Sequence, residues 1–415
     1  MQYGCIGEHL VHSFSKEIHN KIGTYDYILR EVARDDLDRF MTECDFAAIN
    51  VTIPYKQAVI PYLEEMSDKA STIGAVNTIV NRDGKLYGYN TDFAGMKELI
   101  ERTGIAVCGK KVLILGTGGT SKTAAAVAAD MGAREIYKLS RTPGGDGVIG
   151  YDEAYARHSD AEVIINTTPC GMYPKCDGIP IEPEKFPHLE GVADAIYNPL
   201  RSNLVRRAAA TGAAASGGLY MLVAQAVAAA ELFFDTTYEK SVTESVYREI
   251  LTAKENIVLT GMPACGKSTV ARLLAERTGR RVYDTDALIT EREGMEITDI
   301  FAKHGEKYFR DAESAVIHDI SQTSGCIIAT GGGAVLREKN ISALKSNGKV
   351  YFIDKPLEEL MPTDDRPLAS SAEAIRKRYN ERYATYCATA DEITVTSGEF
   401  SSTLAANNIE RSMNK

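Results

Sequence analysis

The sequence has no excess of positive charge, either over the whole chain or within one half of it. Lysine and arginine number 47 against 57 aspartate and glutamate residues, which gives a formal net charge of -10. Nucleic acids and anionic membrane surfaces attract proteins through clustered basic residues. We therefore expect neither partner, and small anionic substrates would have to be bound by locally placed Arg and Lys side chains.

Long hydrophobic runs and paired cysteines are also missing. No segment approaches the roughly 20 apolar residues of a membrane span, and the first residues lack the basic stretch and apolar core of a secretory signal. The 8 cysteines contain no Cys-x-x-Cys pair, which favours reduced thiols over zinc binding or a disulfide framework. We expect a cytoplasmic protein.

Short β-branched runs alternate with longer helical patterns along most of the chain. The clearest runs are Lys111–Leu115, Glu135–Leu139, Val163–Asn166, Val192–Ile196, Ile257–Thr260, Cys326–Thr330 and Lys349–Ile353. Such alternation predicts an α/β fold with parallel sheets wrapped by helices. Glycine-rich loops follow two of the runs, at Gly116 and at Gly261, so we expect two nucleotide-binding domains.

These patterns divide the chain into successive parts. We predict an α/β domain over residues 1–104 and a dinucleotide-binding domain of Rossmann type over 105–218. The apolar segment Leu219–Phe234 predicts a buried helix, and residues 219–252 would pack back onto the first domain. A short polar junction then leads into a P-loop domain over 253–415.

The first glycine-rich loop joins a predicted strand to a helix. Its candidate cofactor-binding residues are Gly116, Gly118, Gly119 and Thr120. Glycines permit the tight turn and let the backbone approach a pyrophosphate at the helix N-terminus. The spacing departs from G-x-G-x-x-G, so an ordinary strand-to-helix turn remains the alternative.

The end of the next predicted strand bears on which dinucleotide binds. An NAD enzyme usually has an acidic residue there for the ribose hydroxyls, but this chain has Ser140-Arg141-Thr142. A guanidinium suits a 2′-phosphate, so these three residues favour NADP(H) over NAD. A solvated surface arginine is the alternative.

The second loop, Gly261-Met-Pro-Ala264-Cys265-Gly266-Lys267-Ser268, matches G-x-x-x-x-G-K-[ST] in full and opens a helix that continues through Thr269. The candidate ATP-binding residues are Gly261, Ala264, Cys265, Gly266, Lys267, Ser268 and Thr269. In such loops the backbone amides cradle the phosphates of ATP. Lys267 would reach the β- and γ-phosphates, and Ser268 would bind Mg²⁺. Taken alone, the motif fits a GTPase, an ATPase or a small-molecule kinase.

Further motifs in the first half carry a family resemblance. They are Asn50-Val-Thr52-Ile-Pro-Tyr-Lys56, Gly74-Ala-Val-Asn77-Thr78, Gly88-Tyr-Asn-Thr-Asp92, Asn166-Thr-Thr-Pro-Cys-Gly-Met172, Asp194-Ala-Ile-Tyr197-Asn-Pro199 and Gly218-Leu-Tyr-Met-Leu-Val-Ala-Gln225. Over about residues 3–235 the chain closely resembles shikimate dehydrogenase.

This resemblance implies a site for a hydroxylated ring carboxylate. It assigns binding of the ring hydroxyls and carboxylate to Ser13, Ser15, Thr52, Asn77, Tyr197 and Gln225. Lys56 and Asp92 would line the same site and perform the proton transfer. A lysine in a cleft can protonate the developing alkoxide, and a neighbouring carboxylate can orient the lysine ammonium. An ordinary surface ion pair is the alternative. Lys16 stands where the family usually has proline.

The second half resembles shikimate kinase over residues 257 to about 395. The resemblance rests on the P-loop and on Asp284-Thr-Asp286, Gly305-Glu-Lys-Tyr-Phe309-Arg310-Asp-Ala-Glu313, Gly331-Gly-Gly333, Asp365-Arg366-Pro-Leu368 and Arg382-Tyr-Ala-Thr-Tyr386.

By this resemblance, the acceptor would be held by Asp286, Arg310, Gly332, Gly333 and Arg382. Asp286 would orient or deprotonate the reacting hydroxyl, Asp284 would support Mg²⁺, and Arg366 would close over the ATP phosphates. A turn or helix cap is the alternative for the two aspartates. The segment 360–365 is acidic where relatives often carry another arginine.

Together the resemblances imply a bifunctional enzyme that reduces 3-dehydroshikimate with NADPH and phosphorylates shikimate with Mg-ATP. One alternative is a quinate/shikimate dehydrogenase fused to another small-molecule kinase. Another is a pseudoenzyme regulator that senses the ligands. The partners expected are small-molecule substrates, and the sequence leaves the oligomeric state open.

Overall fold

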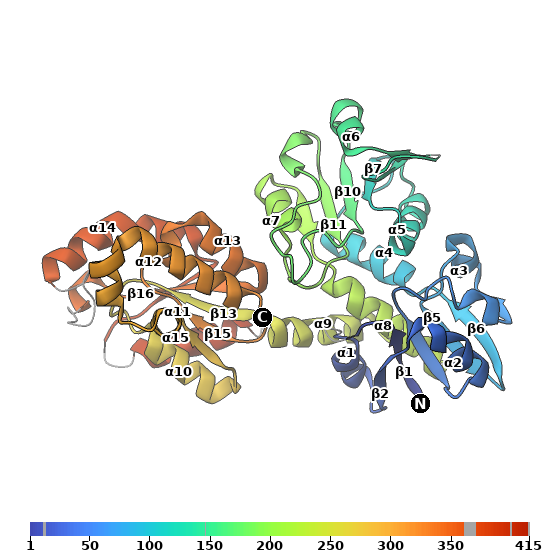
Figure 1. Ribbon diagram of the computed structural model, residues 1–415, viewed down its shortest axis with the longest axis horizontal. Helices are drawn as coiled ribbons and strands as arrows, with labels where there is room; N and C mark the ends of the chain where they lie inside the picture. The colour runs from blue at the N-terminus through green and yellow to red at the C-terminus, as the bar shows by residue number, and fades with distance from the viewer. Residues whose placement is uncertain (11–13, 146, 361–370, 399–400, 414–415) are drawn as a thin grey trace. The chain divides into compact units, whose positions relative to one another are not determined.

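The computed structural model describes residues 1–10, 14–145, 147–360, 371–398 and 401–413. The chain divides into two compact units, Met1–Ile250 and Leu251–Lys415, and each is described by itself. Unit 1 contains two six-stranded sheets and unit 2 a five-stranded sheet. Figure 1 shows helices on the faces of these sheets, so the predicted α/β fold class is confirmed.

The first sheet of unit 1 has the strand order β2-β1-β3-β5-β6-β4. Its strands are β1 (Tyr3–Gly7), β2 (Tyr27–Glu31), β3 (Ala48–Val51), β4 (Glu65–Met66), β5 (Thr78–Arg82) and β6 (Lys85–Tyr89). β5 runs antiparallel to β3 and β6, whereas the other neighbours are parallel. Helices α2 (Leu37–Glu43) and α3 (Asp68–Ile73) pack on one face, and α1 (Ser15–Ile22) precedes β2.

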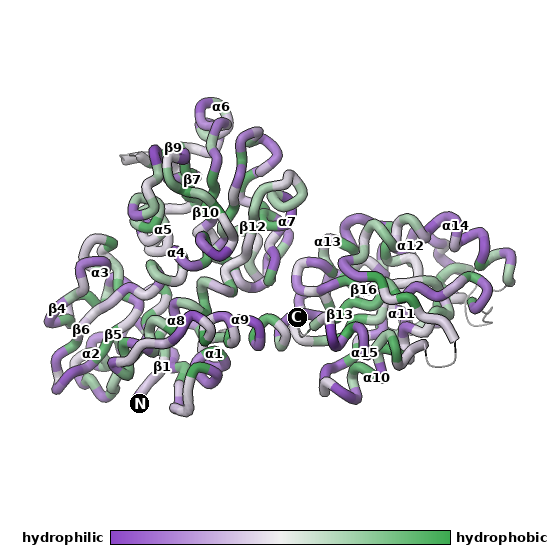
Figure 2. The backbone as a smooth tube through the Cα atoms, turned by 180° about the vertical axis from the view of Figure 1, so that it is seen from behind, coloured by the Kyte–Doolittle hydropathy of each residue, from purple (hydrophilic) through white to green (hydrophobic). Residues whose placement is uncertain are grey.

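The second sheet of unit 1 is entirely parallel, with the order β12-β11-β10-β7-β8-β9. Its strands are β7 (Lys111–Leu115), β8 (Glu135–Leu139), β9 (Val148–Ile149), β10 (Val163–Asn166), β11 (Gly191–Asp194) and β12 (Ala214–Ser216). Helices α4 (Asp92–Thr103) and α5 (Gly119–Asp130) cover one face, and α6 (Tyr151–Arg157) and α7 (Asn203–Ala210) cover the other. Strands buried on both faces have continuous apolar sequences, as the hydrophobic colouring of β7 and β10 in Figure 2 illustrates.

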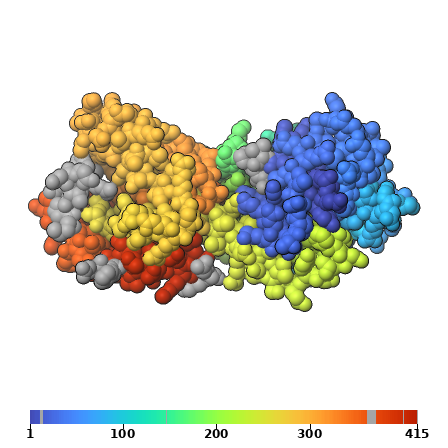
Figure 3. All heavy atoms as spheres, turned by 90° about the horizontal axis from the view of Figure 1, so that it is seen from below, coloured from blue at the N-terminus to red at the C-terminus, as the bar shows by residue number. Residues whose placement is uncertain are grey.

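Helix α8 (Leu219–Phe234) ties the two domains of unit 1 together. Its first turns pack with α4 against the second sheet, and Ala229 and Phe233 pack against the first sheet. Figure 3 shows this yellow-green segment beside the blue N-terminal residues. The crossing with α4 requires glycine at position 95, because a Cβ there would lie 2.5 Å from the Met221 carbonyl oxygen.

Unit 2 is built on a parallel sheet of order β14-β15-β13-β16-β17. Its strands are β13 (Asn256–Thr260), β14 (Val282–Asp284), β15 (Ile327–Ala329), β16 (Gly348–Asp354) and β17 (Glu392–Val395). The preceding helix, α9 (Lys240–Lys254), runs from unit 1 into unit 2.

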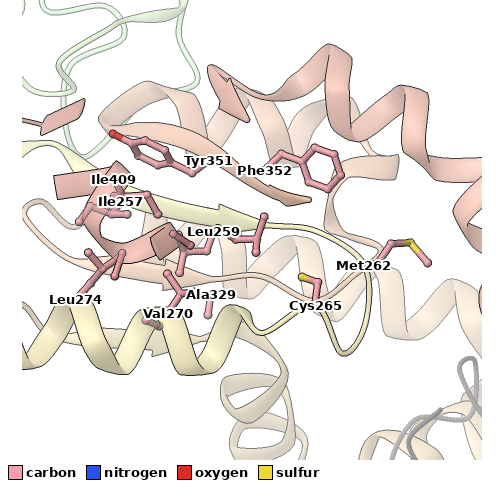
Figure 4. Close-up of a cluster of buried hydrophobic side chains, with 14 of the residues drawn as sticks. Ile257, Leu259, Met262, Cys265, Val270, Leu274, Ala329, Tyr351, Phe352 and Ile409 are labelled. Carbon is pink, nitrogen blue, oxygen red and sulfur yellow. The ribbon is translucent and has the colours of Figure 1, made fainter. Parts of the chain in front are cut away.

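Helices cover both faces of the unit 2 sheet. α10 (Lys267–Thr278), α14 (Ala372–Thr389) and α15 (Ser401–Met413) lie on one face, and α11 (Thr285–Glu293), α12 (Ile297–Ser321) and α13 (Glu338–Asn347) lie on the other. Figure 4 shows the first of these cores, in which Met262 and Cys265 of the P-loop extend the apolar cluster formed by β13 and α10. The phosphate-binding loop is therefore anchored in the core. Among the described residues, no helix has the length and apolar character to cross a membrane.

Candidate active sites

A partly buried ion pair marks the first site. Lys56 lies in the turns after β3, and Asp92 is the first residue of α4. The Lys56 Nζ lies 2.5 Å from Asp92 Oδ2, and the two side chains are only 19% and 10% exposed. The Val76 N–H donates to the Lys56 carbonyl at 2.8 Å. The loop bearing the lysine is thus fixed against the segment that leads into β5.

Buried amide and hydroxyl groups fix the start of α4. The Asn77 Oδ1 accepts the Thr91 N–H at 2.7 Å, and the Asn77 Nδ2 donates to Thr91 Oγ1 at 3.0 Å. The Asn50 Nδ2 donates to Thr78 Oγ1 at 3.1 Å, and Thr78 in turn contacts Thr91. Buried polar groups that are fully paired hold one geometry, so this network orients the helix turn that carries Asp92.

Neither Asn50 nor Thr91 was among the predicted site residues. The sequence did offer an indication, because each is a polar residue near a strand end. Asn50 lies two residues before the predicted Thr52, and Thr91 directly precedes the predicted Asp92. Which of several such neighbours forms the network depends on the pairing of β3 with β5, which places Asn50 opposite Thr78.

Gln225 lies close to this network. It is buried in α8, and its Cβ and backbone nitrogen would lie about 3.0 Å and 3.1 Å from a Cβ at Gly95. Gly95 is three residues after Asp92, so one turn of α4 separates the two. The close crossing of α4 and α8 therefore brings Gln225 towards the carboxylate end of the Lys56–Asp92 pair.

Tyr197 belongs to the second domain of unit 1. It lies in the loop after β11, and its ring centroid is 5.2 Å from that of Phe14. Burial raises the pKa of its phenol. The buried Cys5 thiol is within electrostatic range of Tyr197, Lys56 and Asp92, and burial raises the pKa of Cys5 to about 12. Cys5 is therefore a neutral neighbour of the charged pair.

The remaining predicted residues of this site lie at element ends. Thr52 directly follows β3, with its methyl group packed against Gly7, and Ser15 is the first residue of α1. Ser13 lies outside the described residues.

The dinucleotide loop has the geometry that a pyrophosphate requires. Gly116 has φ +108°, and a Cβ there would lie 2.9 Å from Thr167 Oγ1. Gly118 is exposed and has open space above it, and α5 begins at Gly119 and continues through Thr120. The backbone can therefore approach a phosphate at the helix N-terminus.

At the end of β8, Arg141 and Thr142 are exposed, and the Thr142 N–H donates to Ser140 Oγ at 3.2 Å. Within the described residues, Arg141 forms no ion pair with a carboxylate. An exposed guanidinium beside two hydroxyls fits the 2′-phosphate of NADP(H).

A buried carboxylate, Asp194, joins the two loops that border this domain's site. Its Oδ1 accepts from Asn166 Nδ2 at 2.9 Å and from the Ile196 N–H at 3.0 Å, and its Oδ2 accepts from Ser202 Oγ. Burial raises the pKa of Asp194 to about 6, against the opposing effect of these donors. The loop that bears Tyr197 is thereby fixed to the end of β10.

His19 gives a prediction for the pH dependence of stability. Its ring is fully buried, stacks on Tyr27 with 3.8 Å between centroids, and shares a hydrogen bond with the Tyr25 hydroxyl at 2.5 Å. Burial lowers the pKa of His19 from 6.5 to about 3. Since the folded pKa is depressed, the stabilisation is complete above pH 6.5 and is lost as the pH falls towards 3.

Between about pH 7.5 and about pH 5, the wild-type chain should therefore lose about 2 kcal/mol more unfolding free energy than His19→Gln, at about 1.4 kcal/mol per pH unit. Urea titrations followed by circular dichroism at both pH values measure this difference. Parallel losses in the two proteins would show that His19 does not titrate in this way.

The second site begins at the P-loop between β13 and α10. Gly261 and Gly266 have φ +147° and +97°, and Ala264 is also left-handed at +63°. These angles curl the loop so that its amides can surround an anion. The Lys267 Nζ donates to the carbonyl oxygens of Gly261 and Met262, at 2.9 Å each. Ser268 and Thr269 are exposed in the first turn of α10.

A second glycine loop lies against the P-loop. The Gly331 N–H donates to Thr285 Oγ1 at 2.8 Å, and a Cβ at Gly331 would lie 2.5 Å from Asp286 Oδ1. A Cβ at Gly332 would lie 3.0 Å from Pro263 of the P-loop. Gly331 and Gly332 therefore leave little room for a side chain where Asp286 and the phosphate loop converge.

These elements enclose a cavity of about 250 Å³, which we call the arginine cavity. The residues lining it include Pro263, Asp286, Phe301, Phe309, Arg310, Glu313, Gly331, Gly332, Gly333, Arg378 and Arg382. The structure thus brings together the five residues that were predicted to hold the acceptor. Arg366 lies outside the described residues.

Glu313 and Arg378 were not among the predicted site residues. Glu313 is fully buried, and its Oε2 accepts from Arg310 Nη1 at 2.9 Å. Burial raises the pKa of Glu313, an effect that Arg310 opposes. The i, i+3 spacing of Arg310 and Glu313 was the available signal. Because that spacing is common on exposed helices, burial was needed to distinguish this pair.

The residues present fit a Mg²⁺ ion bound jointly with nucleotide phosphates. The Asp284 Oδ1 caps α11 by accepting the N–H groups of Asp286 and Ala287 at 3.0 and 3.3 Å, while Oδ2 accepts no hydrogen bond from the part of the chain that the structure describes. Ser268 offers an exposed hydroxyl. One hydroxyl and one carboxylate oxygen suit a hard cation that takes its remaining ligands from phosphates and water.

Comparisons with known proteins agree with both halves of the chain. A family model for the shikimate dehydrogenase substrate binding domain matches residues 5–79, and one for shikimate kinase matches residues 263–413. The shikimate dehydrogenase (NADP(+)) of Clostridium beijerinckii is 36% identical over 262 residues, which span 59% of this chain and 96% of that protein.

Two solved structures show the same similarity. A chorismate mutase/shikimate 5-dehydrogenase fusion protein from Clostridium acetobutylicum aligns with TM-score 0.57 and 34% identity, over 60% of this chain and 96% of that one. Shikimate 5-dehydrogenase from Thermus thermophilus, in complex with NADP(H) and shikimate, aligns with TM-score 0.54 and 28% identity, over 60% and 99% of the two chains.

Proposed function

Since the chain belongs to the shikimate dehydrogenase family through unit 1 and carries a shikimate kinase domain in unit 2, we propose that it catalyses two consecutive reactions. Unit 1 reduces 3-dehydroshikimate to shikimate with NADPH, and unit 2 phosphorylates shikimate with Mg-ATP. The product of the first reaction is the acceptor of the second. The cytoplasm, which supplies both NADPH and ATP, is the proposed location.

In unit 1, the Lys56–Asp92 pair is the main structural support for the proposed reduction. Bound NADPH supplies the hydride. Lys56 donates the proton to the oxygen that becomes a hydroxyl, and Asp92 holds the ammonium in place. Ser13, Ser15, Thr52, Asn77, Tyr197 and Gln225 bind the hydroxyls and carboxylate of the substrate. Arg141, with Ser140 and Thr142, binds the 2′-phosphate.

In unit 2, the arginine cavity is the main structural support for the proposed phosphorylation. Asp286, which orients the reacting hydroxyl, lines the same cavity as arginines suited to binding a carboxylate. Lys267, Ser268 and the P-loop amides hold the phosphates, Arg366 closes over them, and Asp284 supports Mg²⁺.

One incubation tests both reactions. The purified chain is supplied with dehydroshikimate, NADPH and Mg-ATP, and shikimate and shikimate 3-phosphate are followed by mass spectrometry. We expect the phosphate ester to form only when both NADPH and ATP are present. Shikimate without its phosphate would refute the kinase function. Ligand binding without any product would favour a sensor over an enzyme.

A further inference from the structure

Two buried polar residues end neighbouring strands of the second sheet in unit 1. Asn166 is the last residue of β10 and Asp194 the last of β11, and the parallel pairing places them opposite each other. Figure 1 shows the two strands side by side. Both side chains are fully buried. In open parallel sheets, ligands bind outside the carboxyl ends of the strands, so the two residues stand at the edge of the sheet where the dinucleotide and its substrate are proposed to meet.

Asn166 fixes the segment that packs against the dinucleotide loop. Its Oδ1 accepts the Thr168 N–H at 3.0 Å and the Thr168 hydroxyl at 2.7 Å. The Thr167 hydroxyl donates to the carbonyl of Leu115, the residue before Gly116, at 2.6 Å. A Cβ at Gly116 would lie 2.9 Å from the Thr167 hydroxyl and 3.2 Å from the Thr168 methyl group. The position of these two threonines therefore limits how the glycine turn can move.

Asp194 fixes the loop that carries Tyr197. Its Oδ1 accepts the N–H of Ile196, the residue directly before the tyrosine, at 3.0 Å. Its Oδ2 accepts a hydrogen bond from Ser202, which in turn caps α7 by accepting the Val205 N–H at 3.3 Å. The carboxylate therefore holds the Tyr197 loop at its beginning and at its end.

A side-chain bond joins the two halves of this network. The Asn166 Nδ2 donates to Asp194 Oδ1 at 2.9 Å. Beside it, the Ala195 N–H donates to the Asn166 carbonyl at 2.9 Å, and the Tyr173 N–H donates to the Asn198 carbonyl at 3.0 Å. A hydrogen bond to an ionised acceptor is about twice as strong as a neutral one. The bond to the carboxylate is thus a strong link that a substitution can remove while the backbone bonds remain.

We infer that Asp194 is a positioning residue that couples the two ligands of unit 1: binding of NADPH at the glycine turn and binding of the ring substrate by Tyr197 strengthen each other through the Asn166–Asp194 bond. This inference rests on the proposed dehydrogenase function and deepens it. The ligand that binds first fixes the shared network, and the second ligand then meets a site that is already ordered. Such coupling is reciprocal, and factors of about fivefold or more are typical.

The coupling is measured from the affinity for NADPH, which unit 1 alone is proposed to bind. NADPH fluorescence gives its Kd with and without saturating shikimate, at about pH 8, above the pKa of about 6 that burial gives Asp194. NADPH and shikimate are both reduced, so no hydride is transferred during the titration. For the wild-type chain, we expect shikimate to lower the Kd of NADPH about fivefold or more. In Asp194→Ala this factor should fall below about twofold, while the Kd of NADPH alone changes by less than about threefold.

Three further variants make the result specific. Asn166→Ala removes the same bond from the other strand and should abolish the coupling in the same way. Asp194→Asn introduces an amide whose oxygen can accept the same two bonds and whose nitrogen can donate to Ser202, so it should restore a factor of at least about threefold. Phe186→Leu is the matched control, because Phe186 is buried in the hydrophobic core of the same domain, and it should keep the wild-type factor.

An undiminished factor in either folded variant, Asp194→Ala or Asn166→Ala, would overturn the inference, as would a factor near one in the wild-type chain. An equal loss in Phe186→Leu would assign the effect to general destabilisation and also overturn it. If neither alanine variant folded, the bond would serve the fold and the inference would be wrong.

Turnover of dehydroshikimate judges the proposed function separately. A wild-type chain with coupled binding but no turnover would refute the proposed reduction and still support the inference. A wild-type chain that reduces dehydroshikimate without coupled binding would refute the inference alone.

Discussion

Replacing Lys56 with alanine should lower kcat for the reduction of dehydroshikimate by at least about a thousandfold. The Lys56 ammonium is held 2.5 Å from Asp92 in a partly buried site, where the charge is worth more than in water. The variant loses both the proton donor and the positive charge that stabilises the developing alkoxide. The rate of NADPH oxidation in the presence of dehydroshikimate measures the effect, and phosphorylation of added shikimate should be unchanged.

A matched control exists in the same unit. Lys85 also pairs with a carboxylate, that of Glu64 at 2.9 Å, but both side chains are more than half exposed. Exposed pairs contribute little, so Lys85→Ala should keep kcat within about twofold of the wild-type value. If Lys56→Ala retained a tenth of the wild-type kcat, the proton would have to come from another group. If its kinase activity fell as well, the two units would not act independently.

The regular parts of the fold were accessible from the sequence because local pattern and burial agree there. The predicted strands Lys111–Leu115, Glu135–Leu139 and Val163–Asn166 match β7, β8 and β10, and the predicted helix Leu219–Phe234 matches α8. The predicted strand Val192–Ile196 extends two residues too far, because β11 covers Gly191–Asp194. The Asp194 carboxylate accepts the Ile196 N–H and so removes it from the ladder.

The mixed character of the first sheet was missed although its signal was present. Asp83 and Gly84 join β5 to β6 and have φ +54° and +84°. An Asp-Gly pair between two strands is a strong hairpin signal. The family motifs around Asn77 and Asp92 lie at the two outer ends of this hairpin, away from its turn.

The candidate sites were only partly predictable, because motifs identify residues that touch ligands more readily than residues that support them. Asp286, Arg310 and Arg382 were identified from their motifs, and the structure gathers them in one cavity. Glu313 and Arg378 line that cavity through helix packing, which a single sequence does not reveal. Ser13 and Arg366 lie outside the described residues, so their roles stay predictions.

Replacing Lys267 with alanine should have the reciprocal effect, lowering kcat/KM for the phosphorylation of shikimate by at least about a thousandfold. The Lys267 ammonium donates to the carbonyl oxygens of Gly261 and Met262, at 2.9 Å each. These bonds hold the lysine within the loop whose amides are proposed to surround the β- and γ-phosphates. Formation of shikimate 3-phosphate measures the loss, and reduction of dehydroshikimate should be unaffected.

Removing Lys267 also affects the two carbonyl groups that it binds, and this effect on the P-loop has to be separated from the loss of phosphorylation. Without the ammonium, they lose buried partners at a cost of about 1–3 kcal/mol, which could loosen the P-loop. Binding of shikimate to the arginine cavity reports on this, since Asp286, Arg310 and Arg382 are untouched in the variant. We expect shikimate affinity to stay within about threefold while phosphorylation is lost, and the exposed Lys303→Ala to keep both. If the variant lost shikimate binding as well as turnover, Lys267 would act mainly by keeping the P-loop folded. If the variant phosphorylated shikimate at the wild-type rate, the proposed role of Lys267 at the phosphates would be wrong.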